Sequence, residues 1–386
     1  MEAPYKEICI CLNLLLTFSV SSCLEEFTLQ PLEGNDRVLI VEGNIGDTVT
    51  SIRLTRTTSL VGDEQIFETN ARVILENENG SFSTDLITNG NGEYKREISL
   101  NTNEKYKISI FTSDGHEYSS EVLSILTTPP IDSIGWDVIN NGLQIHATTN
   151  DNINNTRYFR WTFEETWLYS ARYNSSLIYE NGSLVGRTRD DRIYLCWRTL
   201  PSNSIIIGSS IDLSENIIFK QPTNFIDPFG SLKLSRKYSI KVSQQAITKE
   251  AFEFWELLKK NSENVGTFFD PQPSQLSSNL TCISDSEIPV IGFISASTTQ
   301  EARIFINRSD LPIKGIPIHR AGFCMVDTIP PRAEDIAQAF TGGSNLPVSE
   351  IYSDFGFLIG YGSAPRGCVD CRLQGGTTTK PDFWEN

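Results

Sequence analysis

The most specific chemistry in this sequence belongs to Cys23, a thiol that ends the run Val20-Ser21-Ser22-Cys23. This pattern is typical of the site at which bacterial signal peptidases cut lipoprotein precursors, so that the mature protein starts at a lipidated cysteine. The apolar run before it, residues 8–20, is too short to cross a bilayer and suits the core of a signal peptide. We predict a signal peptide over residues 1–22, lipid attachment at Cys23 and a tether over residues 23–36. The alternative is an ordinary cleaved signal that happens to contain a cysteine.

Two carboxylates, Glu25 and Glu26, follow the cysteine after a single leucine. An acidic pair at this place resembles the export signal that directs lipoproteins of the Bacteroidota to the outer face of the outer membrane. We therefore predict a lipid-anchored protein of the outer membrane that faces outward, held to the bilayer through the acylated Cys23.

Five further cysteines follow Cys23 in the chain. Five thiols cannot all pair within one molecule, and an exported protein is expected to form disulfides among some of them. We predict that Cys196 and Cys324 bond to the pair Cys368 and Cys371, which leaves Cys282 free. The sequence leaves open which member of the pair bonds to which partner.

The close spacing in Cys368-Val369-Asp370-Cys371 allows two other chemistries, a redox-active pair and half of a zinc site. Neither is favoured. No thioredoxin-like βαβ pattern surrounds the motif, and His116, His146 and His319 are not at ligand spacing. We expect structural disulfides, and neither a metal ion nor another cofactor.

Motifs for catalysis are missing from the sequence. It contains no His-Glu-x-x-His, Gly-x-Ser-x-Gly, Walker or Rossmann pattern. A pair of carboxylates of the glycosidase type remains open, because only the fold brings such residues together. We predict a protein without catalytic activity and keep a carboxylate-based surface hydrolase as the alternative.

The formal net charge of −16 bears on the choice of partner. Such an acidic surface repels nucleic acid and anionic lipid headgroups. No segment beyond the first 22 residues is apolar and long enough to span a membrane. We expect no nucleic-acid partner, and we take the charge as a source of solubility.

The chain is expected to be mainly β. Short segments of β-forming residues separated by turns fill residues 37–124, with a hairpin signal at Asp114-Gly115. About seven strands at this spacing are typical of an immunoglobulin-like or fibronectin-type sandwich, which we place at residues 37–126. An open two-layer sheet is the alternative.

Two threonines and two prolines at residues 127–130 favour a stiff, extended connector. We predict a linker over residues 127–133 and a larger β-rich domain over residues 134–386. The stretch 308–367 contains Pro, Gly and Ser and shows little periodicity, so we predict a long loop that the cysteines at its ends tie down.

One amphipathic helix is predicted near residues 249–261. Ala251, Phe254, Trp255 and Leu258 follow helical spacing, and Thr248 is a candidate N-cap. A stripe of this kind usually packs on a core, although it could bind a partner.

Tryptophans offer a second kind of binding feature, because an indole ring can be a platform for sugars or hydrophobic peptides. Most of the six lie in apolar segments and are expected in the core. Trp167 and Trp384 have the weakest arguments for a core position.

Five blocks of sequence resemble a family of the Bacteroidota known only as domain of unknown function 4249. The blocks are Glu250-Ala-Phe-Glu-Phe-Trp255, Gly266-Thr-Phe-Phe-Asp-Pro-Gln-Pro-Ser274, Gly292-Phe-Ile-Ser-Ala296, Cys368-Val-Asp-Cys-Arg-Leu-Gln-Gly-Gly376 and Lys380-Pro-Asp-Phe-Trp384. Together with the lipoprotein start and the β-sandwich half, they extend the resemblance over nearly the whole mature chain. Cys282 lies outside the pattern.

The resemblance implies an outer-membrane lipoprotein commonly encoded beside TonB-dependent transporters, and no established activity comes with it. We therefore predict a non-catalytic accessory protein that docks on a TonB-dependent barrel and assists nutrient capture or gating. A surface hydrolase and a structural or adhesive envelope lipoprotein are the alternatives.

Overall fold

Strands make up most of the computed structural model of this chain, which confirms the mainly β prediction. The structure describes residues 37–57, 65–153, 156–263, 278–319 and 322–385. The predicted signal peptide, residues 1–22, and tether, residues 23–36, lie outside these residues.

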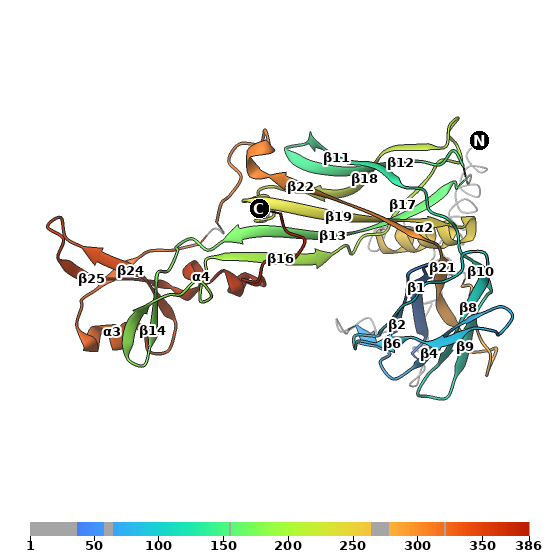
Figure 1. Ribbon diagram of the computed structural model, residues 1–386, viewed down its shortest axis with the longest axis horizontal. Helices are drawn as coiled ribbons and strands as arrows, with labels where there is room; N and C mark the ends of the chain where they lie inside the picture. Colours follow the sequence, from blue (N-terminus) through green and yellow to red (C-terminus); the bar gives the residue numbers. More distant parts are fainter. Residues whose placement is uncertain (1–36, 58–64, 154–155, 264–277, 320–321, 386) are drawn as a thin grey trace, which may run out of the picture. The chain divides into compact units, whose positions relative to one another are not determined.

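The N-terminal part is a sandwich of two sheets, as predicted, whose facing sides share one hydrophobic core (Figure 1). Side chains alternate along its strands, so that Leu39, Val41 and Ile45 point into the core with Ile108 and Ile110 of the other sheet. The first sheet has the order β21-β1-β2-β7-β6, with β3 on β2. Its strands are β1 (Leu39–Ile45), β2 (Val49–Arg56), β3 (Ile66–Phe67), β6 (Ile87–Thr88), β7 (Glu93–Glu97) and β21 (Val290–Ala296).

The second sheet has the order β20-β9-β8-β4-β5, with β10 on β8. Its strands are β4 (Arg72–Asn77), β5 (Ser83–Asp85), β8 (Lys105–Phe111), β9 (Glu117–Ser120), β10 (Leu123–Ser124) and β20 (Leu280–Cys282). The predicted hairpin signal at Asp114-Gly115 joins β8 to β9, where Gly115 has a φ of +89°.

The sandwich is not confined to residues 37–126, and this corrects the predicted domain boundary. β1 pairs in parallel with β21, from Leu39 opposite Val290 to Ile45 opposite Ala296, and β9 pairs with β20. Both added strands come from the part of the chain that we assigned to the second domain. Sequence pattern identifies a strand but not a partner about 250 residues away, so the shared sheet could not be predicted. Residues Leu39–Asn386 accordingly form one compact unit.

The predicted linker lacks regular structure from residue 127 to 130, and its two middle residues, Thr128 and Pro129, are buried. The Thr128 hydroxyl accepts a hydrogen bond from the Ala246 N–H at 2.9 Å, and the Pro129 carbonyl accepts one from Gln244 Nε2 at 2.9 Å. Thr128 also contacts Thr298 through both its N–H and its hydroxyl. These hydrogen bonds hold the connector in place, and β11 begins at Ile131.

The larger part contains two more sheets around a second core. One has the order β11-β12-β18, and the other has the order β16-β13-β19-β22 with β17 on β13. Their strands are β11 (Ile131–Ile139), β12 (Gly142–Asn150), β13 (Tyr158–Ser170), β16 (Leu195–Pro201), β17 (Ile206–Ser209), β18 (Ile217–Ile226), β19 (Lys237–Ile247) and β22 (Thr299–Asn307). In Figure 1, β13, β19 and β22 run as long neighbouring strands.

The predicted amphipathic helix is confirmed as α2 (Lys249–Glu263). Its N-terminus is capped as expected, because the Ala251 N–H donates to the Thr248 hydroxyl at 3.2 Å. Ala251, Phe254 and Trp255 are buried and form a small core with Phe293 of β21. The helix stripe therefore packs inward between the two parts of the fold.

Residues 308–367 are not the long loop that we predicted. They contain η1 (Arg308–Asp310), β23 (Asp327–Ile329), α3 (Ala333–Phe340), β24 (Asn345–Tyr352) and β25 (Leu358–Pro365), and the sheet order is β23-β25-β24. Pro347 and two register shifts interrupt the alternation that would have indicated strands. The hairpin β14 (Leu177–Glu180) and β15 (Ser183–Gly186), α4 (Arg366–Val369) and η2 (Cys371–Gln374) complete the chain.

Gly292 allows β21 to lie against β1. Its φ is +135°, and a Cβ atom there would lie 1.8 Å from the Val41 carbonyl oxygen. We predict that Gly292→Ala lowers the free energy of unfolding by about 2 kcal/mol or more, because both the backbone strain and the clash must be relieved. Urea unfolding followed by far-UV circular dichroism measures the change.

Gly186→Ala is the matched control, since nothing lies within 4 Å of a Cβ atom at that position. Equal unfolding midpoints for the two variants would contradict the close approach of β21 to β1.

Candidate functional site

The predicted lipid-attachment residue Cys23 and the export residues Glu25 and Glu26 lie outside the residues that the structure describes. Lipid attachment and surface export therefore stay predictions from the sequence.

The other predicted site residues are four cysteines, and the structure joins them in two disulfides. Cys196 bonds to Cys371 and Cys324 bonds to Cys368, while Cys282 is a buried free thiol. Each bond joins one isolated cysteine to one member of the terminal pair, as we predicted. The redox and zinc interpretations of Cys368-Val369-Asp370-Cys371 required two free thiols, and both are bonded here.

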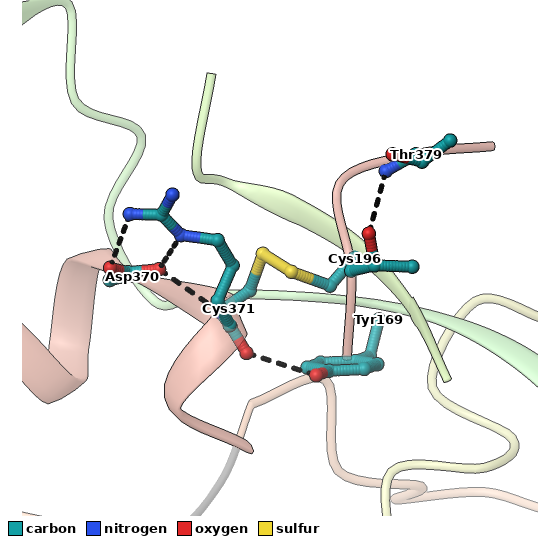
Figure 2. The surroundings of a disulfide bond; sticks show 7 residues. Tyr169, Cys196, Asp370, Cys371 and Thr379 are labelled. Carbon is teal, nitrogen blue, oxygen red and sulfur yellow. Dashed lines mark hydrogen bonds and ion pairs between the residues drawn. A yellow bond between two sulfur atoms is a disulfide. The ribbon is translucent and has the colours of Figure 1, made fainter. Parts of the chain in front are cut away.

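The Cys196–Cys371 disulfide fixes the C-terminal segment onto β16, and its neighbours add hydrogen bonds (Figure 2). The Tyr169 hydroxyl of β13 donates to the Cys371 carbonyl at 2.9 Å. The buried Asp370 carboxylate accepts from Arg372 Nε and Nη2, both at 2.8 Å. Burial by itself raises the pKa of Asp370, but the hydrogen bonds and charge of Arg372 outweigh it and lower the pKa.

Beyond the disulfide the chain continues along β16. Trp197 and Thr377 exchange two backbone hydrogen bonds of 2.8 Å, and the buried Trp384 packs edge-on against Trp197 and Phe305. Trp384 is therefore a core residue, although its sequence context was a weak argument for a core position.

The second disulfide, Cys324–Cys368, stabilises the segment that carries β23, β24 and β25. Tyr173 supports both of its ends, because its hydroxyl donates to the Cys324 carbonyl at 2.9 Å and its N–H donates to the Cys368 carbonyl at 3.0 Å. The hydrophobic core of this segment is small, with Ile193, Val348, Ala364 and Val369 as its buried members. A covalent bond adds most to stability where so little apolar surface is buried.

A cavity of about 530 Å³ lies beside the Cys196–Cys371 disulfide. This volume is within the range of small-molecule sites, roughly 300–1,000 Å³. Its wall combines side chains of β13 and β16 with the loop before β19 and the C-terminal segment. The lining residues are Trp167, Tyr169, Arg172, Arg198, residues 229–232, Pro317, His319 and Gln374.

Cations and aromatic rings give this cavity its chemical character. Arg198 Cζ lies 5.6 Å from the Trp167 ring centroid, and Lys233 Nζ lies 5.5 Å from it. Lys233 also forms an ion pair with Glu165. Within the part of the chain that the structure describes, no Asp or Glu lines the cavity. The arrangement suits the binding of a negatively charged group, and it lacks a lining carboxylate that could act as a general acid or base.

The His319 side chain contributes a weak polar contact at the cavity wall. Its Nδ1 lies 3.5 Å from the hydroxyl of buried Ser170, and that hydroxyl accepts from Arg236 Nη2 at 3.1 Å. An arginine donor stabilises negative charge on the hydroxyl, but the histidine contact is long for proton transfer.

Among the described residues, no group of three or more His, Cys, Asp or Glu side chains could hold a metal ion. Of the helices described, none has the length and apolarity to cross a membrane.

The sequence did not identify this cavity. Trp167 was singled out as a tryptophan with a weak core argument, and it is buried with its ring at the cavity wall. No pattern in the sequence around Arg172 or Arg198 indicated a role in binding. Their joint placement follows from the β13–β16 pairing and the disulfide, which no spacing in the sequence reveals.

The fold and the site define a disulfide-bonded, mainly β protein with a cavity lined by arginine and aromatic side chains. The chain belongs to the family described as Domain of unknown function (DUF4249), which matches residues 25–303 and so confirms the predicted family. Three of the five blocks of sequence lie within this range, and the two C-terminal blocks lie beyond it. The search of curated proteins found no match.

Three solved structures show weak similarity to this chain. A protein from Corynebacterium diphtheriae described as membrane anchored is 10% identical, with a TM-score of 0.16, over 54% of this chain and 54% of its own. The chitinase ChiA74 from Bacillus thuringiensis is 12% identical, with a TM-score of 0.15, over 50% of this chain and 29% of its own. The BSP domain of a biofilm-associated protein is 8% identical, with a TM-score of 0.14, over 70% of this chain and 59% of its own. None of the three is covered to two thirds of its length, and TM-scores this low carry no argument about fold or function.

Peptide mapping of the non-reduced protein tests the disulfides. We predict two cross-linked peptides, one joining Cys196 to Cys371 and one joining Cys324 to Cys368, because these pairs have Cα–Cα distances of 5.8 and 5.9 Å. Cys282 is expected to react with iodoacetamide only after unfolding, since it is buried.

A reduced sample, in which all five thiols react, is the control for digestion and detection. Cross-links from Cys196 to Cys368 or from Cys324 to Cys371 would show that the C-terminal segment is attached differently.

Proposed function

We propose that this protein is a lipid-anchored, non-catalytic accessory protein of a TonB-dependent outer-membrane transporter, exposed on the cell surface and involved in nutrient capture or gating. The Cys23 pattern supports lipid attachment, and the acidic pair Glu25 and Glu26 supports surface export. The two disulfides are consistent with an oxidising compartment outside the cytoplasm.

An exposed apolar surface at the end of the β24–β25 hairpin is the observation that carries the docking proposal. Phe355 and Phe357 in the turn are 87% and 73% exposed, and neighbouring Tyr352, Leu358 and Ile359 are also exposed. Figure 1 shows the β24–β25 hairpin near α3 and β14. We call these five residues the hairpin-end surface. Clustered exposed apolar side chains mark interaction sites in proteins, and here they stand out in a chain of net charge −16.

The turn itself is ordered by backbone hydrogen bonds. The Ser353 N–H donates to the Phe357 carbonyl at 2.8 Å, and the Gly356 N–H donates to the Ser353 carbonyl at 2.9 Å. Exposed aromatic side chains on a fixed turn lose little conformational entropy on binding, which favours them as anchors in a protein interface. The occupant that we propose is the extracellular surface of the TonB-dependent barrel.

The test is a pull-down of the tagged protein from its native outer membrane in mild detergent, followed by mass spectrometry. We predict recovery of one TonB-dependent barrel in stoichiometric amount, and its loss with Cys23→Ala, which removes the lipid anchor. The double variant Phe355→Ser/Phe357→Ser keeps the anchor and is expected to reduce barrel recovery at least about tenfold, because hot-spot aromatics contribute 2 kcal/mol or more.

Phe219→Ser is the matched control, because Phe219 is 72% exposed on β18, outside the hairpin-end surface. Recovery of the lipoprotein alone, or equal barrel recovery with the double variant and this control, counts against the docking proposal.

A further inference from the structure

We infer that the cavity beside the Cys196–Cys371 disulfide is a binding site for a small organic anion, a ligand with a carboxylate or phosphate group on a partly apolar body. The inference specifies the ligand class for the nutrient-capture part of the proposed function. It can be tested on the purified protein without the barrel, so the two proposals can fail separately.

The charge of the cavity is opposite to that of the chain. The protein has 48 acidic and 32 basic side chains, yet Arg172 and Arg198 line the cavity and no carboxylate does within the described residues. Positive groups gathered in a concave site attract an anion more strongly than the same groups on an open surface, because the surrounding protein excludes water.

Arg198 is held in place before any ligand arrives. Its Nη1 donates to the Gln374 carbonyl at 3.0 Å, and its guanidinium lies over the Trp167 ring. Gly375 lies against this guanidinium, since a Cβ atom there would be in van der Waals contact with Arg198 Cζ at 3.4 Å. Gln374 and Gly375 lie three and four residues after Cys371, so the disulfide helps to position this arginine.

Most donors of Arg198 remain available to a ligand. Nη1 to Gln374 is its one hydrogen bond to the described residues, and a guanidinium has five N–H donors. Arg172 is exposed at the cavity and forms no ion pair with the described residues. Two guanidinium groups that have N–H donors available suit a carboxylate or a phosphate, which they can bind through paired hydrogen bonds.

Nearby charges do not cancel these two arginines. The Glu165 carboxylate pairs with Lys233, and Asp227, behind the loop at Gly230, accepts the Phe229 N–H at 2.9 Å. Arg236 donates to Ser170 and to the Tyr194 hydroxyl. Neither Arg172 nor Arg198 forms an ion pair with a carboxylate among the described residues, so both keep their positive charge for a ligand.

Other residues of the cavity lining are apolar and suit the uncharged part of the ligand. Phe229 is 50% exposed, and Leu232 and Pro317 line the same cavity. A sugar ring or hydrocarbon face could pack there while its anionic group meets the arginines. The volume of about 530 Å³ admits a ligand between a monosaccharide and a dipeptide in size.

Saturation-transfer NMR and isothermal titration calorimetry test the site with four probes: glucuronate, glucose 6-phosphate, hippurate and neutral glucose. We expect at least one of the three anions to bind and glucose to bind at least tenfold more weakly. The sugar acid, the phosphate ester and the amino-acid conjugate distinguish the sources of the anionic group. Raising NaCl from 50 to 500 mM is expected to weaken binding.

Arg172→Gln is the principal variant, because this exposed side chain has no internal partner whose loss would disturb folding. This variant is expected to lower the affinity for the anion about tenfold, which corresponds to the loss of one charge-assisted hydrogen bond. Arg198→Gln is expected to weaken it at least as much, with circular dichroism as a check on folding. Arg53→Gln, at the exposed position of β2 in the N-terminal sandwich, removes the same charge and is expected to leave affinity unchanged.

Absence of saturation transfer to all three anions would overturn the inference. So would equal affinity for glucose, or an Arg172→Gln affinity equal to that of Arg53→Gln.

Discussion

The disulfide between Cys196 and Cys371 is the constraint on which the functional part of this structure depends. It joins residues 175 apart in sequence and holds the C-terminal segment against β16. Without that attachment Gln374 and Gly375 would not lie at Arg198, and the cavity would lose one wall. In the usual entropic account, a bond that closes so long a loop removes much of the freedom of the unfolded chain. The same bond therefore contributes to stability and to the shape of the site.

The second disulfide, Cys324–Cys368, stabilises a part of the molecule that has a small hydrophobic core. The sheet of β23, β25 and β24 covers a small core whose buried members among the described residues are Ile193, Val348, Ala364 and Val369. The same sheet carries strongly exposed aromatic side chains. Burial this small offsets little of the entropy lost on folding, so a covalent attachment and the two Tyr173 hydrogen bonds are needed to keep the hairpin ordered. Because these bonds fix the base of the hairpin, Phe355 and Phe357 stay exposed and the strands keep their packing.

Features with a local cause could be predicted from the sequence. The helix over 249–261 followed from spacing within one segment, and the pairing of Cys196 and Cys324 with the terminal cysteines followed from counting thiols in an exported chain. The β1–β21 pair could not be predicted, because its strands are separated by most of the chain and either core could have accepted Val290–Ala296. The β24–β25 hairpin was missed because Pro347 and its bulges hide the alternation. The cavity combines separate segments, none of which has a distinctive pattern alone.

Positive charge is used sparingly in this acidic protein, and much of it lies over aromatic rings. Arg160 Cζ is 4.0 Å from the Trp255 ring centroid, and Arg303 Cζ is 3.7 Å from that of Phe383. Such contacts hold a helix or a terminal segment against a sheet, and Arg303 also pairs with Glu164 at 3.3 Å. Arg198 also lies over an aromatic ring, at a longer 5.6 Å from Cζ to the Trp167 centroid, but it faces an open cavity, where its remaining donors have no protein acceptor among the described residues. A contact that is structural elsewhere in the fold thus becomes, at this one position, the basis of a binding site.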